Sequence, residues 1–122
     1  MTKKSPKQTI SFGPVHAMRM ARLDQDEALA RRFGTRFKMM QVSALKPDTR
    51  ASHAERHGKL FTPDEIRAWY ELDGNAEECR CAFVKVLLDP YGRPLTPSII
   101  DRARQAFEKM KAKGKGEWTK VL

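Results

Sequence analysis

A strand-like run enclosed by two proline-marked helix starts constrains the fold of this chain more than any other feature. Residues 81–88 are rich in aliphatic and aromatic side chains, which favour a β-strand, and the turn-forming residues 89–92 follow them. Thr62 and Thr96 each precede a proline, the arrangement of an N-cap residue and the first residue of a helix. A helix is therefore expected on each side of the strand, and the sequence predicts an α+β fold.

Weaker signals extend this pattern toward the N-terminus. Residues 37–42 partly alternate between apolar and polar side chains and predict a second strand. Asp24 followed by Glu27 has the form of a capping box, so a helix is expected to start there, after a shorter helix that begins at Pro14. Residues 50–61 show no clear period. We therefore expect a small sheet of two to three strands with flanking helices and basic tails.

Length and charge distribution predict one domain with a basic segment at each end. The chain has 122 residues, of which 40% are hydrophobic, so it can bury one modest core. We expect residues 13–111 to form the domain, residues 1–12 a disordered basic arm, and residues 112–122 a basic tail with Trp118 as an isolated anchor. The lysines expected to contact phosphates are Lys3, Lys4, Lys7, Lys111, Lys113, Lys115 and Lys120.

The formal net charge of +9 makes nucleic acid the expected partner. Two basic arms on a domain of mixed charge suit contacts with phosphates that do not depend on base sequence. No apolar run is long enough to span a bilayer, and no apolar secretion segment follows the basic N-terminus, so we expect no membrane association and a cytoplasmic setting. Two cysteines in such a compartment argue against a disulfide framework.

Three short segments stand in a distinctive order: 48–53 (DTRASH), 57–61 (HGKLF) and 79–81 (CRC). This order resembles the head morphogenesis domain of tailed phages, the Mu F-like minor head protein family, over about residues 36–88. The chain departs from that family at residues 74–78, where a Pro-His-Pro-Asn stretch is common, and at Arg56, where leucine is common. The matching residues are Arg50, His53, His57, Gly58, Lys59, Phe61, Cys79, Arg80 and Cys81.

The resemblance implies a structural protein rather than an enzyme. Members of this family are minor components of the phage head, present near the portal, and associate with portal, capsid or scaffold proteins and with packaged DNA. The virion and the cytoplasm of the bacterial host are the locations that follow from the resemblance. It implies no catalytic residue and no cofactor.

The residue types of two segments also allow a zinc site. His53 and His57 lie four apart and would share a face of a helix, and Cys79 and Cys81 lie two apart and would point the same way on a strand. The spacing of the cysteines is tighter than is usual for zinc ligands, and Gly58 suggests that a helix through His57 ends there. The alternative is that the cysteines are small buried side chains at the start of a strand.

The competing functional hypothesis is a small metal-independent ribonuclease of the toxin type. Such an enzyme needs an acid–base residue and cations that stabilise the charged phosphate. His53 or His57 could supply the first, and the cations would be Arg50, Lys59 and Arg80. The alternative for the histidines is that they hydrogen-bond within the irregular segment 50–61, and for the arginines that they are surface cations.

Overall fold

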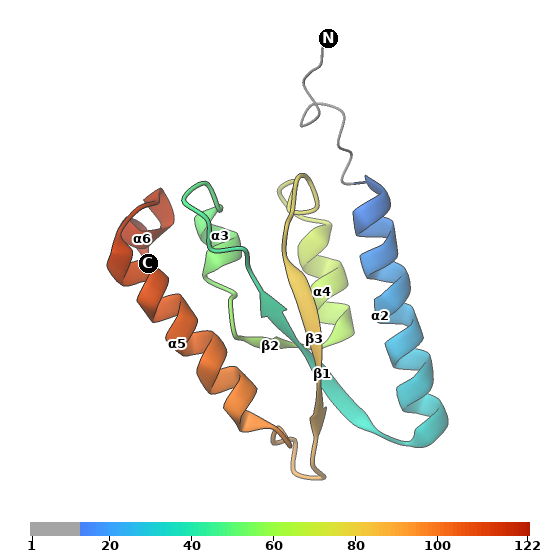
Figure 1. Ribbon diagram of the computed structural model, residues 1–122. Helices are drawn as coiled ribbons and strands as arrows, with labels where there is room; N and C mark the ends of the chain where they lie inside the picture. The colour runs from blue at the N-terminus through green and yellow to red at the C-terminus, as the bar shows by residue number, and fades with distance from the viewer. Residues whose placement is uncertain (1–12) are drawn as a thin grey trace.

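The structure, a computed structural model, describes residues 13–122. Three strands form one antiparallel sheet in the order β2-β1-β3, and helices lie on its flanks (Figure 1). The expected α+β class with a small sheet is therefore confirmed. The elements are α2 (Gly13–Phe33), β1 (Arg36–Val42), α3 (Ala51–Ala54), β2 (Leu60–Phe61), α4 (Pro63–Tyr70), β3 (Ala82–Leu88), α5 (Pro97–Lys113) and α6 (Glu117–Val121).

The sheet is built around β1, which pairs with both other strands. Its pairing with β3 runs from Arg36 opposite Leu88 to Val42 opposite Ala82, so all seven residues of each strand take part. The two-residue β2 pairs with β1 at Met39 and Met40. Because side chains alternate along a strand, these two methionines face opposite sides of the sheet, and both are buried.

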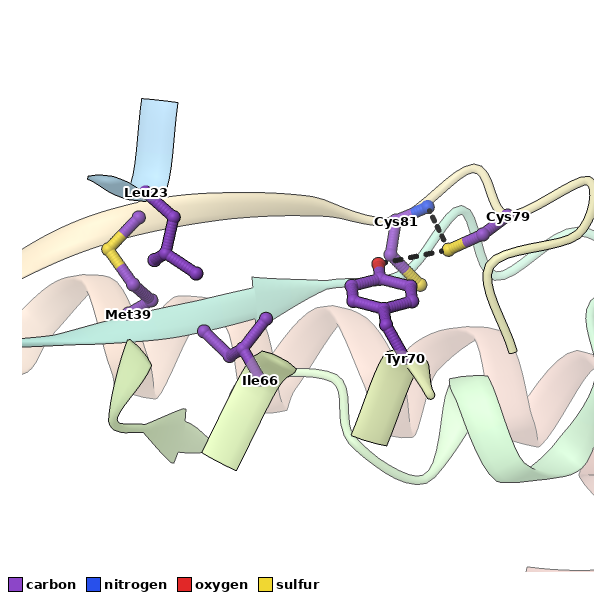
Figure 2. Close-up of a cluster of buried hydrophobic side chains, with 6 residues drawn as sticks. All are labelled: Leu23, Met39, Ile66, Tyr70, Cys79 and Cys81. Atoms are coloured by element: carbon purple, nitrogen blue, oxygen red, sulfur yellow. Dashed lines mark hydrogen bonds between the residues drawn. The ribbon is translucent and has the colours of Figure 1, made fainter. Parts of the chain in front are cut away.

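The main core lies where α2 and α4 meet the sheet. It joins side chains from α2, β1, α4 and the segment that leads into β3 (Figure 2). Cys79 and Cys81 belong to this core. Buried cysteines at the start of a strand were one alternative from the sequence, and both are buried just before β3. The buried members are Leu23, Met39, Ile66, Tyr70, Cys79 and Cys81.

The predicted capping box at the start of α4 is present. The backbone N–H of Glu65 donates to the Thr62 hydroxyl at 3.1 Å, and the Glu65 carboxylate accepts from the Thr62 N–H at 2.8 Å. The proline-marked start of α5 is also confirmed, although Thr96 makes no side-chain capping hydrogen bond. At its other end α5 stops at Gly114, which adopts a left-handed conformation with φ 65°.

The expectation of a helix start at Asp24 is wrong. Residues Gly13–Phe33 form one continuous helix, and Asp24 lies inside it. The carboxylates of Asp24 and Glu27 both accept from the guanidinium of Arg67 on α4, so their spacing serves an ion-pair network between helices. These contacts raise the pKa of Arg67 well above its usual value, because Glu27 and then Asp24 hydrogen-bond to it.

No helix within residues 13–122 has the length and apolar character needed to cross a bilayer.

The C-terminal residues are not the free tail expected for 112–122. Helix α5 continues to Lys113, past the predicted boundary, and α6 folds back against α5 and α3. Trp118 is 2% exposed and packs in a second core with Leu45 and Ala54. Its indole N–H donates to the Lys46 carbonyl at 2.9 Å. The C-terminal segment is held against the domain because the large indole of Trp118 buries enough apolar area to hold a short basic helix in place.

Candidate metal centre

Residues 74–77, in the segment before β3, are held by Arg50 at the start of α3. The guanidinium of Arg50 donates to the carbonyls of Gly74 at 3.1 Å, Asn75 at 3.4 Å and Glu77 at 2.6 Å. Its planar fork of donors suits such a set of acceptors. The ion pair of Arg80 with Asp48 and the contact of Cys81 with His53 bring together the segments 48–53 and 79–81, which are distant in sequence.

His53, Cys79 and Cys81 form one buried cluster at this junction. One side-chain ligand atom from each lies within 4.8 Å of the others, and the three residues are 3%, 1% and 5% exposed. The Cys81 sulfur lies 3.6 Å from Nδ1 of His53. Bond lengths of about 2.3 Å for zinc to sulfur and 2.0 Å for zinc to nitrogen place such atoms roughly 3.5 Å apart in a tetrahedral site. The observed separation therefore matches a pair of zinc ligands.

Neighbouring side chains fix the backbone and the sulfur atoms of the cluster. Arg19 on α2 donates to the carbonyls of Cys79 at 3.1 Å and of Cys81 at 3.0 Å. The Tyr70 hydroxyl lies 3.2 Å from the Cys79 sulfur, and the Cys81 N–H donates to that sulfur at 3.4 Å (Figure 2). The ring of His53 packs edge-on against Trp69, with 4.7 Å between centroids. The ligand atoms are thus pre-positioned by their surroundings.

These contacts shift the pKa values of the two cysteines in opposite directions. Hydrogen bonding from the Cys81 thiol, with further bonds from His53 and Tyr70, lowers the pKa of Cys79. The pKa of Cys81 is raised, because it shares its proton with Cys79 and is itself buried. Metals bind cysteine as the thiolate. The surroundings of Cys79 thus favour the thiolate, the form in which cysteine binds a metal ion.

His57 does not belong to this cluster, so the predicted set of four zinc ligands is wrong in one member. Helix α3 ends at Ala54, and Gly58 has a φ of 79°, so the two histidines do not share a helical face. Nδ1 of His57 instead accepts from the Ser43 N–H at 3.0 Å. Burial lowers the pKa of His57. His57 thus makes a structural hydrogen bond, although to Ser43 in the loop after β1 and not within the segment 50–61 as the alternative expected.

The five residues named for a ribonuclease lie around two separate hollows. Arg50, His53 and Arg80 line a small cavity beside the cysteines, whereas His57 and Lys59 line another hollow with Arg104 of α5. Nε2 of each histidine is buried. Arg80 also forms an ion pair with Asp48, with 2.9 Å between nitrogen and oxygen. These residues do not form a single open site for an RNA backbone.

The lysines predicted to bind nucleic acid fall into two groups. Lys3, Lys4 and Lys7 lie outside the described residues. The others lie on α5, α6 and the turn between them, where Lys113, Lys115 and Lys120 are exposed and Lys111 is half-buried. Lys120 lies 4.0 Å from the exposed carboxylate of Glu117, a contact too weak to neutralise it in water. The C-terminal lysines are therefore held on a folded helical pair.

Sequence reasoning missed two supports of the cluster, Arg19 and Tyr70. Arg19 acts on carbonyls 60 and 62 residues away, and no local pattern links it to them. Tyr70 lies in α4, and its contact with Cys79 depends on how the turn at 71–81 folds back. Comparisons with protein-family models, with curated proteins and with solved structures found no match to this chain.

Proposed function

We propose that this chain is a minor head or head-assembly structural protein of a tailed phage, active in the virion and in the cytoplasm of the bacterial host. The observation that supports the proposal is the convergence of the segments that carry the family resemblance. His53 contacts Cys81 in a buried junction, and the exposed Arg50 donates to the carbonyl of Glu77, two residues before Cys79. The partners that follow from the resemblance are portal, capsid or scaffold proteins.

A ribonuclease has less support, because its proposed residues are divided between two hollows and its histidines are buried. The test is incubation of the purified chain with tRNA in EDTA. We expect no cleavage by the wild type. Cleavage that is lost in His53→Ala or His57→Ala would replace the structural role with an enzymatic one.

The head-assembly proposal is tested in particles. Phage heads are induced from a host that carries the gene with a peptide tag, treated with nuclease, and separated on a density gradient. We expect the tagged chain to sediment with the heads and to do so in few copies relative to the major capsid protein. A chain found only in the soluble fraction, with heads assembling normally after deletion of the gene, contradicts the proposal.

We further propose that the chain binds nucleic acid without sequence preference through its basic segments. The exposed Lys113, Lys115 and Lys120 and the net charge of +9 support this role. Each neutralised phosphate of duplex DNA contributes about 0.9 to the slope of log affinity against log salt. Replacing the three lysines by glutamine should therefore lower that slope by about 2 to 3.

A matched control separates position from net charge. Arg22, Arg31 and Arg32 are exposed on α2, on the flank opposite α5 (Figure 1), and their replacement by glutamine removes the same charge. Binding to a mixed-sequence duplex is measured by fluorescence anisotropy at several salt concentrations. The lysine variant should lose more of the slope than the arginine variant. Equal losses would place the contacts elsewhere, and a wild type without salt dependence would end the proposal.

We also propose that the cluster of His53, Cys79 and Cys81 binds a zinc ion. Two sulfur ligands and an imidazole are the donor set that zinc prefers, and the separation of 3.6 Å between Nδ1 and sulfur fits its geometry. Elemental analysis of the protein purified without chelator should give about one zinc per chain. Cys81→Ser should lose the ion while His57→Asn, outside the cluster, should keep it. Retention of full zinc by Cys81→Ser would contradict this assignment.

A further inference from the structure

The metal cluster has three protein ligands, whereas zinc in proteins is usually four-coordinate. We propose that the zinc held by His53, Cys79 and Cys81 keeps an open fourth position, which holds a water molecule that small monodentate anions displace. This inference rests on the zinc site proposed above and adds to it a binding function. Structural zinc sites are closed by four protein ligands, so an open position marks a site built to accept something else.

The described residues offer no fourth ligand in the cluster. The group able to hold a metal within residues 13–122 consists of these three side chains. The Tyr70 hydroxyl shares a hydrogen bond with the Cys79 sulfur at 3.2 Å, and Tyr70 does not line the cavity beside the cluster. The nearest cavity-lining carboxylates are those of Asp48, which pairs with Arg80, and of Glu78, which is exposed.

A small cavity adjoins the cluster and is lined by two of its three residues. Its volume is about 40 Å³, and both His53 and Cys81 line it. A water molecule needs at least roughly 10–15 Å³ of such space, so the cavity admits one to three waters or one small anion. Two arginines, Arg50 and Arg80, and two carboxylates, Asp48 and Glu78, also line it, so the lining itself has no net charge. The cavity is thus sized for a small ligand, and the attraction for an anion would come from the zinc ion.

Unpartnered polar atoms in the lining residues independently point to a ligand. Within the described part of the chain, the hydroxyl of Ser43 and Nε2 of His53 are buried and have no hydrogen-bond partner. Ser43 and His53 are 5% and 3% exposed, and both line the cavity. A buried polar group without a partner costs about 1–3 kcal/mol. A water or anion in the cavity would supply a partner for the Ser43 hydroxyl, whereas Nε2 of His53 lies across the ring from Nδ1, the nitrogen closest to Cys81, and does not face the fourth position.

Cobalt substitution tests the inference. The protein is stripped of metal and reconstituted with Co²⁺, whose thiolate charge-transfer band reports the cysteines and whose visible d–d bands report the remaining coordination. Sodium azide is then titrated in. We expect the thiolate band to persist while the d–d bands shift in a saturable manner, as azide replaces the bound water.

Point variants distinguish a change at the open coordination position from a loss of the metal site itself. Ala44 is exposed and lines the cavity, so Ala44→Leu should fill its mouth and weaken azide binding by about tenfold or more while the thiolate band remains. Ala106→Leu, exposed on α5, is the matched control and should bind azide as the wild type does. Asp48→Asn and Glu78→Gln should leave the cobalt spectrum unchanged.

Each outcome has a distinct meaning. Absence of a thiolate band on cobalt addition would show that the zinc site itself is wrong. A thiolate band with d–d bands that do not respond to azide would leave the metal site standing and overturn the open position. A spectrum that changes in Asp48→Asn or Glu78→Gln would identify a carboxylate as the fourth ligand and would also overturn it.

Discussion

Substitution of Gly116 by alanine tests whether the C-terminal residues are part of the domain. A Cβ atom at position 116 would lie 2.4 Å from the carbonyl oxygen of Pro47, 2.8 Å from its Cα and 3.0 Å from its carbonyl carbon. A carbon and a carbonyl oxygen approach to about 3.3 Å at closest, so relief requires a displacement on the order of 1 Å. The obstacle is backbone, which cannot rotate away as a side chain can. The shift must therefore move α6 from its place.

The expected loss of stability follows from this displacement. Overpacking of a fitted contact costs about 1–3 kcal/mol, and a shift of α6 also loosens the burial of Trp118 and its hydrogen bond to Lys46. We expect Gly116→Ala to lower the free energy of unfolding by roughly 2–3 kcal/mol, which corresponds to a fall in Tm on the order of 10 °C. The indole of Trp118 gains exposure, so its fluorescence emission should shift to longer wavelength.

Gly114 provides the matched control two residues away. It has a φ of 65°, but a Cβ there meets nothing within 4 Å. Gly114→Ala should therefore cost only the backbone strain of a left-handed residue, about 1 kcal/mol, with no emission shift. Urea unfolding and fluorescence of both variants decide the matter. If Gly116→Ala is no less stable than Gly114→Ala and its emission is unchanged, the docking of α6 against residue 47 is refuted.

Three further predictions concern the junctions that hold the fold. Thr62→Ala should cost about 1 kcal/mol in urea unfolding because it removes the cap of α4, whereas Thr96→Ala, at a position without a capping hydrogen bond, should cost less; equal losses would contradict the capping argument. Arg50→Gln should cost roughly 1–3 kcal/mol and Arg50→Lys should restore little of it, because the contacts to three carbonyls need the guanidinium fork; full rescue by lysine would show that charge alone matters. Because burial lowers the pKa of His57 below 6.5, the unfolded chain takes up a proton first, so stability should be full above about pH 6.5 and should fall as the pH drops below it. His57→Asn keeps an acceptor for the Ser43 N–H and should flatten this fall; an unchanged pH profile of unfolding would remove His57 as its source.

The elements that were predicted correctly are those that a few neighbouring residues determine by themselves. The capping box of α4 needs only Thr62, Pro63 and Glu65, and the structure contains it. The run 81–88 carries enough strand-forming side chains to identify β3 by itself. By contrast, β2 is two residues long and exists because it pairs with β1, so nothing in residues 60–61 alone could show it.

The metal cluster illustrates a different limit of sequence reasoning. The four-residue spacing of His53 and His57 predicts a shared face only if the helix continues through both. Helix α3 spans four residues, and the left-handed Gly58 redirects the chain, so the second histidine turns to Ser43. Gly58, which indicates that the helix ends before it, can be read from the sequence. What was not visible is the arginine at position 19 that fixes the cysteine backbone from another helix.

The position of the C-terminal lysines has a consequence for how the chain would hold nucleic acid. A flexible arm loses conformational freedom when it contacts phosphates, and that loss opposes binding. Lys113, Lys115 and Lys120 are attached to a helical pair that the burial of Trp118 already fixes, so less of that cost remains to be met on binding. Loosening α6 should therefore weaken DNA binding without removing a charge. Gly116→Ala tests this directly, since it should lower the affinity for DNA at a given salt concentration. The number of phosphate contacts, and hence the salt slope, should stay closer to wild type than in the lysine variant.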